Sequence, residues 1–160
     1  VIKLPPERWH EYKNLWLQAL KDDPQAFGDS YNDKIADTDD KWQERAKDRI
    51  LFATDGNDLI GMVGVWQSDE DRKKKTANVF GVYVVPEFRG KGISKMLMQS
   101  LLDELNRDES ITKLKLSVNK DQLPAVKLYE SFGFKSTKQE KNLLGDGNYY
   151  DEYSMEKDLL

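Results

Sequence analysis

Two glycines in a short loop mark the part of this chain whose residue types best suit ligand binding. The apolar run Val82-Tyr83-Val84 leads into the loop Arg89-Gly90-Lys91-Gly92-Ile93-Ser94, and a helical pattern begins directly after it. Glycine lacks a Cβ atom, so the backbone of such a loop can curl and bring its N–H groups close to a ligand. The start of the helix adds unpaired N–H groups and the positive end of its dipole. The arrangement predicts a site for an anion, in particular a diphosphate.

Two common nucleotide-binding motifs do not fit this loop, and the glycines alone fit an ordinary tight strand-to-helix turn equally well. A Walker loop needs four residues between its glycines and then Gly-Lys-Ser/Thr, which is absent here. The dinucleotide fingerprint needs a third glycine, but Gly92 is followed by Ile93-Ser94-Lys95. The choice between a turn and a site therefore needs a second motif.

That second motif follows later in the chain. Residues Ala125, Leu128, Tyr129, Gly133 and Phe134 fit the pattern Ala-x-x-Leu-Tyr-x-x-x-Gly-Phe. Together the two segments resemble the GNAT superfamily, the acetyl-coenzyme A-dependent N-acetyltransferases. The coenzyme loop of that family reads Gln/Arg-x-x-Gly-x-Gly/Ala; Arg89, Gly92 and Ser94 stand at its fixed positions, Ser94 being a departure at the last. The resemblance covers residues 50 to 157 and, more loosely, the N-terminal helices.

The resemblance implies that the anion is the diphosphate of acetyl-coenzyme A, held by backbone N–H groups of the glycine loop. It also implies that the pantetheine arm pairs with the preceding strand, where an N–H near Val84 would polarise the thioester carbonyl. Arg89 either contacts the coenzyme or organises the loop, and a side-chain amide is expected from Asn119 or Gln122. The expected coenzyme-binding residues are Val82, Tyr83, Val84, Arg89, Gly90, Lys91, Gly92, Ile93, Ser94, Asn119 and Gln122.

Tyr129 is the expected catalytic residue, because the family places a tyrosine here near the thioester sulfur. A phenol has a reference pKa near 10, which suits it to protonate a leaving thiolate. From periodicity alone, Tyr129 reads as an ordinary residue of an amphipathic helix. The general base stays open: the strand 77–85 contains no carboxylate, so Glu87, Asp29, Tyr31, Tyr83 and a water relay all remain candidates.

The acceptor site is expected between two segments that usually form its walls in this family. Here these are residues 23–42 and 143–150, from which we single out Phe27, Asp29, Tyr31 and Tyr149. Several acidic residues in these walls suit a cationic amine, although acids also simply solubilise loops. Polyamines, aminoglycosides, amino-acid analogues and protein N-termini all stay open as acceptors.

The pattern of elements predicts one domain over residues 1–160, of the mixed α+β class with a GNAT-type, mostly antiparallel sheet flanked by helices. Thr38 is the expected N-cap of the second helix, and Gly133 the expected residue just past the last one. The stretch 68–75 reads as a charged, solvated connection. Helices are expected at 6–20, 39–48, 91–106 and 122–132, and strands at 1–4, 50–54, 59–67, 77–85, 113–118, 134–141 and 149–157.

The composition of the chain argues against several classes of protein and of site. The 160 residues carry a formal net charge of −4 and no cysteine, which argues against a general nucleic-acid binder, disulfides, thiolate metal sites and a cysteine nucleophile. The single histidine, His10, argues against a histidine-rich metal site, and no metal is expected. No apolar run approaches the roughly 20 residues of a membrane span. We expect a cytoplasmic protein, monomeric or homodimeric, that does not bind membranes.

The predicted function is therefore transfer of the acetyl group of acetyl-coenzyme A to a primary amine, by direct attack in a ternary complex. Two alternatives stay open: a non-catalytic coenzyme A-binding regulatory module, and an acyltransferase that uses a different acyl-coenzyme A donor. The amine belongs to a small molecule or to a protein or peptide.

Overall fold

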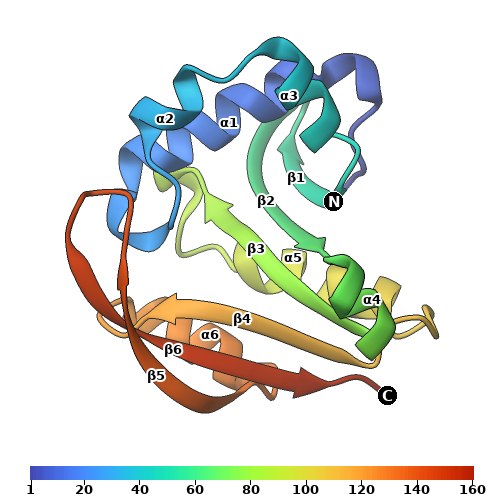
Figure 1. Ribbon diagram of the computed structural model, residues 1–160. Coiled ribbons are helices and arrows are strands. Elements are labelled where there is room, and N and C mark those ends of the chain that lie inside the picture. The colour runs from blue at the N-terminus through green and yellow to red at the C-terminus, as the bar shows by residue number, and fades with distance from the viewer.

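The computed structural model describes residues 1–160 and contains one mixed sheet of six strands (Figure 1). The strand order is β1-β2-β3-β4-β6-β5, and every neighbouring pair is antiparallel except β3 and β4. This confirms the expected fold class. The strands are β1 (Arg49–Asp55), β2 (Asp58–Trp66), β3 (Thr76–Val84), β4 (Lys113–Asn119), β5 (Lys135–Leu143) and β6 (Tyr149–Asp158).

Helices cover both faces of the sheet and enclose two separate apolar cores. On one face lie α1 (Trp9–Asp22), α2 (Tyr31–Ile35) and α3 (Asp39–Arg45), with the short turns η1 (Pro6–Arg8) and η2 (Pro24–Ala26). Their core includes Trp16, Trp42, Phe52 and Tyr83. The opposite face carries α5 (Ile93–Leu105) and α6 (Leu123–Ser131), whose apolar stripes bury residues such as Leu97 and Val126. The short helix α4 (Asp69–Lys74) follows β2, and the turn η3 (Pro86–Phe88) follows β3.

The feature that creates a site is the divergence of the two parallel strands. β3 and β4 pair only over Thr76–Asn78 and Lys113–Lys115, and beyond these residues they separate (Figure 1). A bulge in β3 contributes, because its register against β2 shifts by one residue between Met62 and Gly64. Gly81, in this bulge, has φ +66, and a Cβ there would press on the Trp16 ring. Bulges bend a strand and raise its twist, so β3 leaves its neighbour.

Several element boundaries follow their expected local signals. Thr38 caps α3 by accepting a hydrogen bond from the Lys41 N–H at 3.4 Å, as expected. Gly133 follows α6 with φ +89, the left-handed conformation expected of it. None of the helices has the length and apolar character that crossing a bilayer requires.

Two expectations about local structure were wrong, and one helix had not been predicted. The stretch 68–75 contains α4, because Ser68 and Asp71 form a reciprocal capping box that starts a helix. Residues 1–4 form no strand and contribute only an isolated bridge between Ile2 and Phe52. The polar stretch 24–37 contains α2, whose first turn is capped by Ser30.

Candidate active site

The glycine loop forms an open cradle of backbone donors. Gly90 and Gly92 have φ +78 and +79, and an added Cβ at either would meet nothing within 4 Å. Gly92 is the N-cap residue of α5. None of the N–H groups from Gly90 to Lys95 donates a hydrogen bond within the chain. Unpaired N–H groups at a helix start, with no side chain over them, fit a diphosphate.

Arg89 holds this loop in place. Its Nε donates to the Val84 carbonyl at 2.9 Å, and its Nη2 pairs with the Asp23 carboxylate at 2.7 Å. Its guanidinium also lies 5.6 Å from the centre of the Tyr83 ring. Of the two roles left open for Arg89, this geometry favours organising the loop, because the guanidinium is already paired within the chain.

The free edge of β3 offers backbone groups to an extended ligand. The Val84 carbonyl, which accepts from Arg89, points away from β2, and in a strand the N–H of the same residue points to the same side. That side faces the gap left by β4. The gap opens into a cavity of about 770 Å³, the coenzyme cavity. The expected residues that line it are Val82, Tyr83, Val84, Arg89, Gly90, Gly92, Ile93, Ser94, Asn119, Gln122 and Tyr129. Lys91 is absent from its lining, and its Nζ lies instead 5.3 Å from the centre of the Phe88 ring.

Tyr129 reaches the coenzyme cavity from α6. Its side chain is 7% exposed and packs edge-to-face on Phe134, with ring centroids 5.9 Å apart. Burial raises the pKa of the Tyr129 phenol, so the group keeps its proton at neutral pH. Its hydroxyl has no hydrogen-bond partner within the chain although it lines the cavity. The phenol is therefore placed as a proton donor to something that enters from outside.

The two candidate amides have different surroundings. Asn119 is 1% exposed, and its Nδ2 donates to the Gln25 carbonyl at 2.9 Å. Its Oδ1 accepts from the Asp121 N–H at 2.9 Å. Both ends of this amide are thus paired within the chain: Nδ2 joins β4 to η2, and Oδ1 holds the turn after β4. Gln122 lines the coenzyme cavity with no side-chain partner, which makes it the better placed of the two.

A second cavity of about 810 Å³, the acceptor cavity, lies on the α1–α3 side of the sheet. The two cavities meet where β3 and β4 diverge, because they share lining residues from both strands and from the loop after η2. The shared residues are Ala26, Phe27, Val79, Phe80, Gly81, Leu116 and Ser117. A ligand in one cavity can therefore contact a ligand in the other through the sheet.

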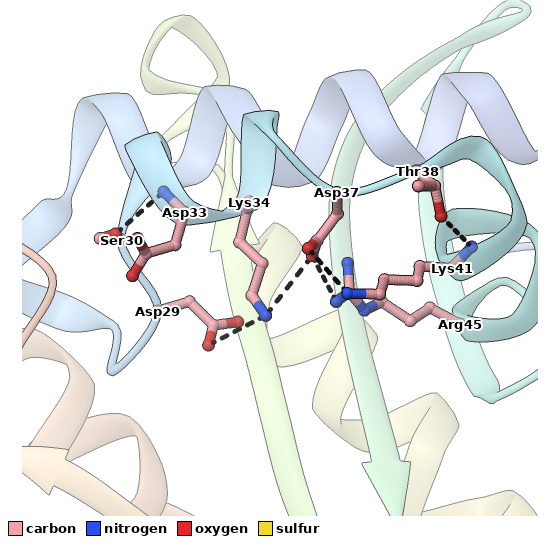
Figure 2. Close-up of polar contacts among 8 residues, drawn as sticks. All are labelled: Asp29, Ser30, Asp33, Lys34, Asp37, Thr38, Lys41 and Arg45. Atoms are coloured by element: carbon pink, nitrogen blue, oxygen red, sulfur yellow. Dashed lines mark hydrogen bonds and ion pairs between the residues drawn. The ribbon is translucent and has the colours of Figure 1, made fainter.

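A polar network, centred on Asp37, supports one wall of the acceptor cavity (Figure 2). Asp37 pairs with Arg45 at 2.6 Å, with Lys41 at 3.5 Å and with Lys34 at 3.8 Å. The hydrogen bond from Arg45 holds the pKa of the Asp37 carboxyl below its usual range. Lys34 also reaches Asp29 at 3.7 Å. The network joins α2 to α3 and fixes two residues that line the cavity, Asp29 and Arg45.

The structure brings together only some of the expected acceptor residues. Phe27 lines both cavities, and Asp29 lines the acceptor cavity. Tyr31 lines neither, and Lys21 Nζ lies 5.4 Å from the centre of its ring. Tyr149 is 67% exposed near the tip of the β5–β6 hairpin and also lines neither cavity.

The hairpin tip nevertheless contacts the backbone of two residues that line the acceptor cavity, Phe27 and Asp29. The Gly145 N–H donates to the Phe27 carbonyl at 2.7 Å. A Cβ at Gly145 would overlap the backbone oxygen of Asp29, so only glycine allows this approach. The β5–β6 hairpin and the loop after η2 are thus joined through their backbones (Figure 1).

One buried carboxylate in the acceptor cavity, Glu152, was missed by the sequence reasoning. It is 9% exposed on β6, and burial raises the pKa of its carboxyl, partly offset by a hydrogen bond from Asn142. The alternation of residues 152, 154 and 156 places them on one face of a strand, but the sequence does not say which face. The candidate bases named from the sequence are less suitable: Tyr83 donates its hydroxyl proton to Asp22, and Glu87 is exposed outside both cavities.

Comparisons with known proteins agree with this geometry. The profile of the acetyltransferase (GNAT) family matches residues 11–134. The L-amino acid N-acetyltransferase AaaT of Escherichia coli is 28% identical over 124 residues, which are 74% of this chain and 75% of that protein. A GNAT-family acetyltransferase structure from Streptococcus pneumoniae superposes with a TM-score of 0.83 at 16% identity, covering 99% and 98% of the two chains. The yncA structure from Salmonella typhimurium, which contains acetyl-coenzyme A, has a TM-score of 0.78 at 22% identity, covering 99% and 92%.

These matches confirm the expectation of an N-acetyltransferase that takes its acetyl group from acetyl-coenzyme A, and they favour an enzyme over a non-catalytic binding module. No group of three or more His, Cys, Asp or Glu side chains is arranged to hold a metal ion. With 124 of its residues covered by one family profile, the chain belongs to the acetyltransferase (GNAT) family.

Proposed function

We propose that this chain acetylates the primary amine of a small molecule or peptide by direct attack, with the two substrates bound on opposite faces of the sheet. The coenzyme enters from the α5–α6 side and the amine from the α1–α3 side. The observation that carries this proposal is the meeting of the two cavities where β3 and β4 diverge. Direct attack needs both reactants held in contact, and an opening through the sheet provides that.

Each part of the coenzyme cavity has one role in this proposal. Acetyl-coenzyme A supplies an acetyl thioester as the electrophile. The N–H groups of Gly90 to Lys95 hold the diphosphate, and Gln122 offers its amide to the pantetheine arm. The Val84 N–H donates to the thioester oxygen as negative charge develops there. Tyr129 gives its proton to the departing sulfur, because its raised pKa keeps it protonated until then.

A buried guanidinium nitrogen favours an acceptor that carries a carboxylate. Arg45 lines the acceptor cavity, and its Nη1 is buried without a hydrogen-bond partner. The guanidinium pairs with Asp37 through Nη2, but a buried N–H donor without an acceptor is costly, and a substrate carboxylate would supply one to Nη1. The relative from Escherichia coli, whose name describes an L-amino acid N-acetyltransferase, supports the same class. We therefore propose L-amino acids or peptide N-termini as the first acceptors to test.

The test has two steps. The first is a thermal shift of the purified chain with acetyl-coenzyme A; ligand at 100 times its dissociation constant adds about 2.7 kcal/mol, which raises Tm by several degrees. The second measures thiol release with a panel of L-amino acids, the dipeptide Ala-Ala and 1,4-diaminobutane. Transfer to the first two but not to the diamine supports a carboxylate-bearing acceptor, and a preference for the diamine contradicts it. No thermal shift at millimolar coenzyme contradicts the proposed function itself.

Three finer points stay predictions. Competition between acetyl-coenzyme A and longer acyl-coenzyme A donors tests the expected donor preference. The choice between monomer and homodimer, and the expected cytoplasmic location, rest on the sequence reasoning alone.

A further inference from the structure

Two acids of the acceptor cavity, Glu152 and Asp48, form no ion pair, and of these two only Glu152 is a buried side chain. Asp29 pairs with Lys34, Glu140 pairs with Lys138 at 2.7 Å, and Glu156 pairs with Lys113 at 3.3 Å. Glu152 forms no ion pair, although it is the most buried of these side chains. Its only hydrogen bond comes from Asn142 Nδ2 to Oε1 at 3.1 Å, which leaves Oε2 without a partner.

An unpaired, buried carboxylate is not explained by the needs of the fold. Removing a charged carboxylate from water costs several kcal/mol unless a cation or several donors compensate. A single amide donor compensates little of this. Oε2 keeps some contact with the water of the cavity, so the carboxylate is desolvated only in part, and a positively charged or proton-donating ligand would offset the cost that remains.

The strand register places Glu152 beside the opening through the sheet. Glu152 lies directly opposite Asn119 of β4, and Ser117 lies opposite Ser154. Glu152 and Ser117 are thus diagonal neighbours on one face, with backbones about 7 to 8 Å apart. Ser117 lines both cavities, whereas Glu152 lines the acceptor cavity alone. The Glu152 carboxylate is therefore on the amine side of the opening, within reach of a bound amine directly or through one water.

The charged groups around Glu152 are few and mostly paired with each other. On β5, Glu140 lies directly opposite Glu152, and Lys138, two positions before it, is the partner of Glu140. The neighbour on β4, Asn119, does not titrate. Across the cavity, Asp29 is held by Lys34, and on β6 the Tyr150 hydroxyl donates to Asp146. Two further cations, Arg45 and Lys115, line the cavity, but neither they nor the groups above form an ion pair with Glu152.

We propose that Glu152 binds the acceptor amine as an ammonium ion and takes its proton, so that it supplies the general base of this enzyme. The inference rests on the proposed function and extends it to a residue and to a substrate class: primary amines that arrive protonated. This residue is on β6 and was not among the candidate bases named from the sequence.

The proton balance of the step is complete with the groups named. One N–H bond of the ammonium breaks, and its proton passes to a Glu152 oxygen and then to water. The freed nitrogen lone pair forms the C–N bond to the acetyl carbon, and the C–S bond breaks. The sulfur takes the Tyr129 proton, and the second proton lost from nitrogen restores the phenol. The net products are the acetamide, the free thiol of coenzyme A and one proton.

The substitution Glu152→Gln separates catalysis from structure, because glutamine keeps the shape and an oxygen for Asn142 while removing the charge and the base. The readouts are the acetyl-coenzyme A thermal shift and thiol release from pH 6 to 10. The probes are Ala-Ala, with an α-amine of pKa near 8, and Nα-acetyl-lysine, with an amine near 10.4. At pH 7 these are about 10% and about 0.04% neutral, so the lysine amine depends more on a base.

We expect Glu152→Gln to keep the thermal shift with acetyl-coenzyme A. At pH 7 it should lower kcat/KM by about 100-fold for whichever of the two amines the wild-type chain acetylates faster. The deficit should shrink as the pH approaches the pKa of that amine, because the substrate then arrives neutral. If both amines are substrates, the fall in kcat/KM at pH 7 should be larger for the lysine amine than for the α-amine of Ala-Ala. The control is Glu104→Gln, which removes a partly buried carboxylate of α5 that lines neither cavity and should leave the rate unchanged.

The outcomes distinguish this inference from the proposed function. If wild-type chain binds acetyl-coenzyme A and acetylates an amine, an unchanged rate and pH profile in Glu152→Gln overturn the role of Glu152 alone. A loss that is equal at every pH also overturns it, because it indicates a structural effect. If wild-type chain shows neither a thermal shift nor transfer to any amine, the proposed function fails, and the inference fails with it.

Discussion

The two cavities of this protein are built in different ways. The coenzyme cavity depends on backbone groups from one continuous stretch, β3 and the loop into α5, where N–H groups from Gly90 to Lys95 are free. The acceptor cavity depends on side chains that arrive from α1, α3, η2 and the loop after it, and the five strands β2 to β6. A site built from backbone groups keeps its hydrogen-bond donors when the surrounding side chains are substituted. A site built from side chains changes its shape and charge with each substitution. The difference teaches that the coenzyme would be held mainly by backbone groups on one face of the sheet, whereas the side chains that would select and deprotonate the amine lie on the other.

The structure also shows how the two cavities are kept in register with each other. Asn119 joins the end of β4 to Gln25 beside η2, and Arg89 joins the glycine loop to Asp23 just before η2. Both contacts connect a coenzyme-side element to the wall of the acceptor cavity. Residues that were expected to bind the coenzyme thus align the two halves of the site.

The largest expected effect is that of Tyr129→Phe, which removes the proton donor on the coenzyme side. We expect kcat to fall about 100-fold or more while the acetyl-coenzyme A thermal shift stays as in wild type. Tyr153→Phe is the matched control, because Tyr153 packs on the same core but lines neither cavity. The measurement is the steady-state rate of thiol release. Equal rates in Tyr129→Phe and Tyr153→Phe would contradict the role of Tyr129 as proton donor.

Gly92→Ala should affect the coenzyme side alone. The left-handed φ of +79 costs an alanine about 1 to 2 kcal/mol, and the open space around it lets the chain still fold. We expect the dissociation constant for acetyl-coenzyme A, measured by calorimetry, to rise about 10-fold. Gly56→Ala carries similar strain, with φ +60 and open space, in the distant β1–β2 turn. An equal loss of affinity in both variants would show that strain, and not the cradle, is responsible.

Gly145→Ala should affect the acceptor side alone. The new Cβ would overlap the Asp29 backbone oxygen, so the hairpin tip must move away from the loop after η2. We expect a loss of about 1 to 3 kcal/mol in stability and a several-fold rise in KM for the amine, with acetyl-coenzyme A affinity unchanged. Gly147→Ala, in the same tip but facing open space, tests turn strain without the overlap. Weaker coenzyme binding in Gly145→Ala would contradict the independence of the two cavities.

The smallest expected effect is on the pH dependence of stability. Burial raises the pKa of the Glu152 carboxyl, so the folded state loses stability as the pH rises from the ordinary glutamate pKa, and this loss is complete above the raised value. Glu152→Gln should therefore unfold at a higher temperature than wild type at pH 7, by no more than about 3 °C. The difference should vanish below the ordinary glutamate pKa, where both side chains are neutral. Calorimetric Tm values at pH 4 and pH 7 test this, and a lower Tm for the variant at pH 7 would contradict an unpaired carboxylate.

Much of the fold was predictable because its signals are local. The alternation in β4, the apolar stripe of α5 and the cap at Thr38 each lie within a few residues of what they determine. The helix α4 was missed for a different reason: its capping box at Ser68 and Asp71 is local, but a charged surface segment offered no apolar stripe to indicate a helix. Residues 1–4 were predicted to form a strand, but their pairing with β1 is limited to one bridge between Ile2 and Phe52.

The sequence by itself determined the glycine cradle, the position of Tyr129 and the family, since each depends on short-range spacing between residues of fixed type. Only the tertiary structure decided that Asn119 is paired with the distant Gln25, that Arg89 holds the loop, and that Tyr31 and Tyr149 stay outside both cavities. The tertiary structure alone also decided that Glu152 is buried without an ion-pair partner. The physical reason is that strand register and the divergence of β3 from β4 set which side chains meet, and these arise from pairing between segments far apart in the chain.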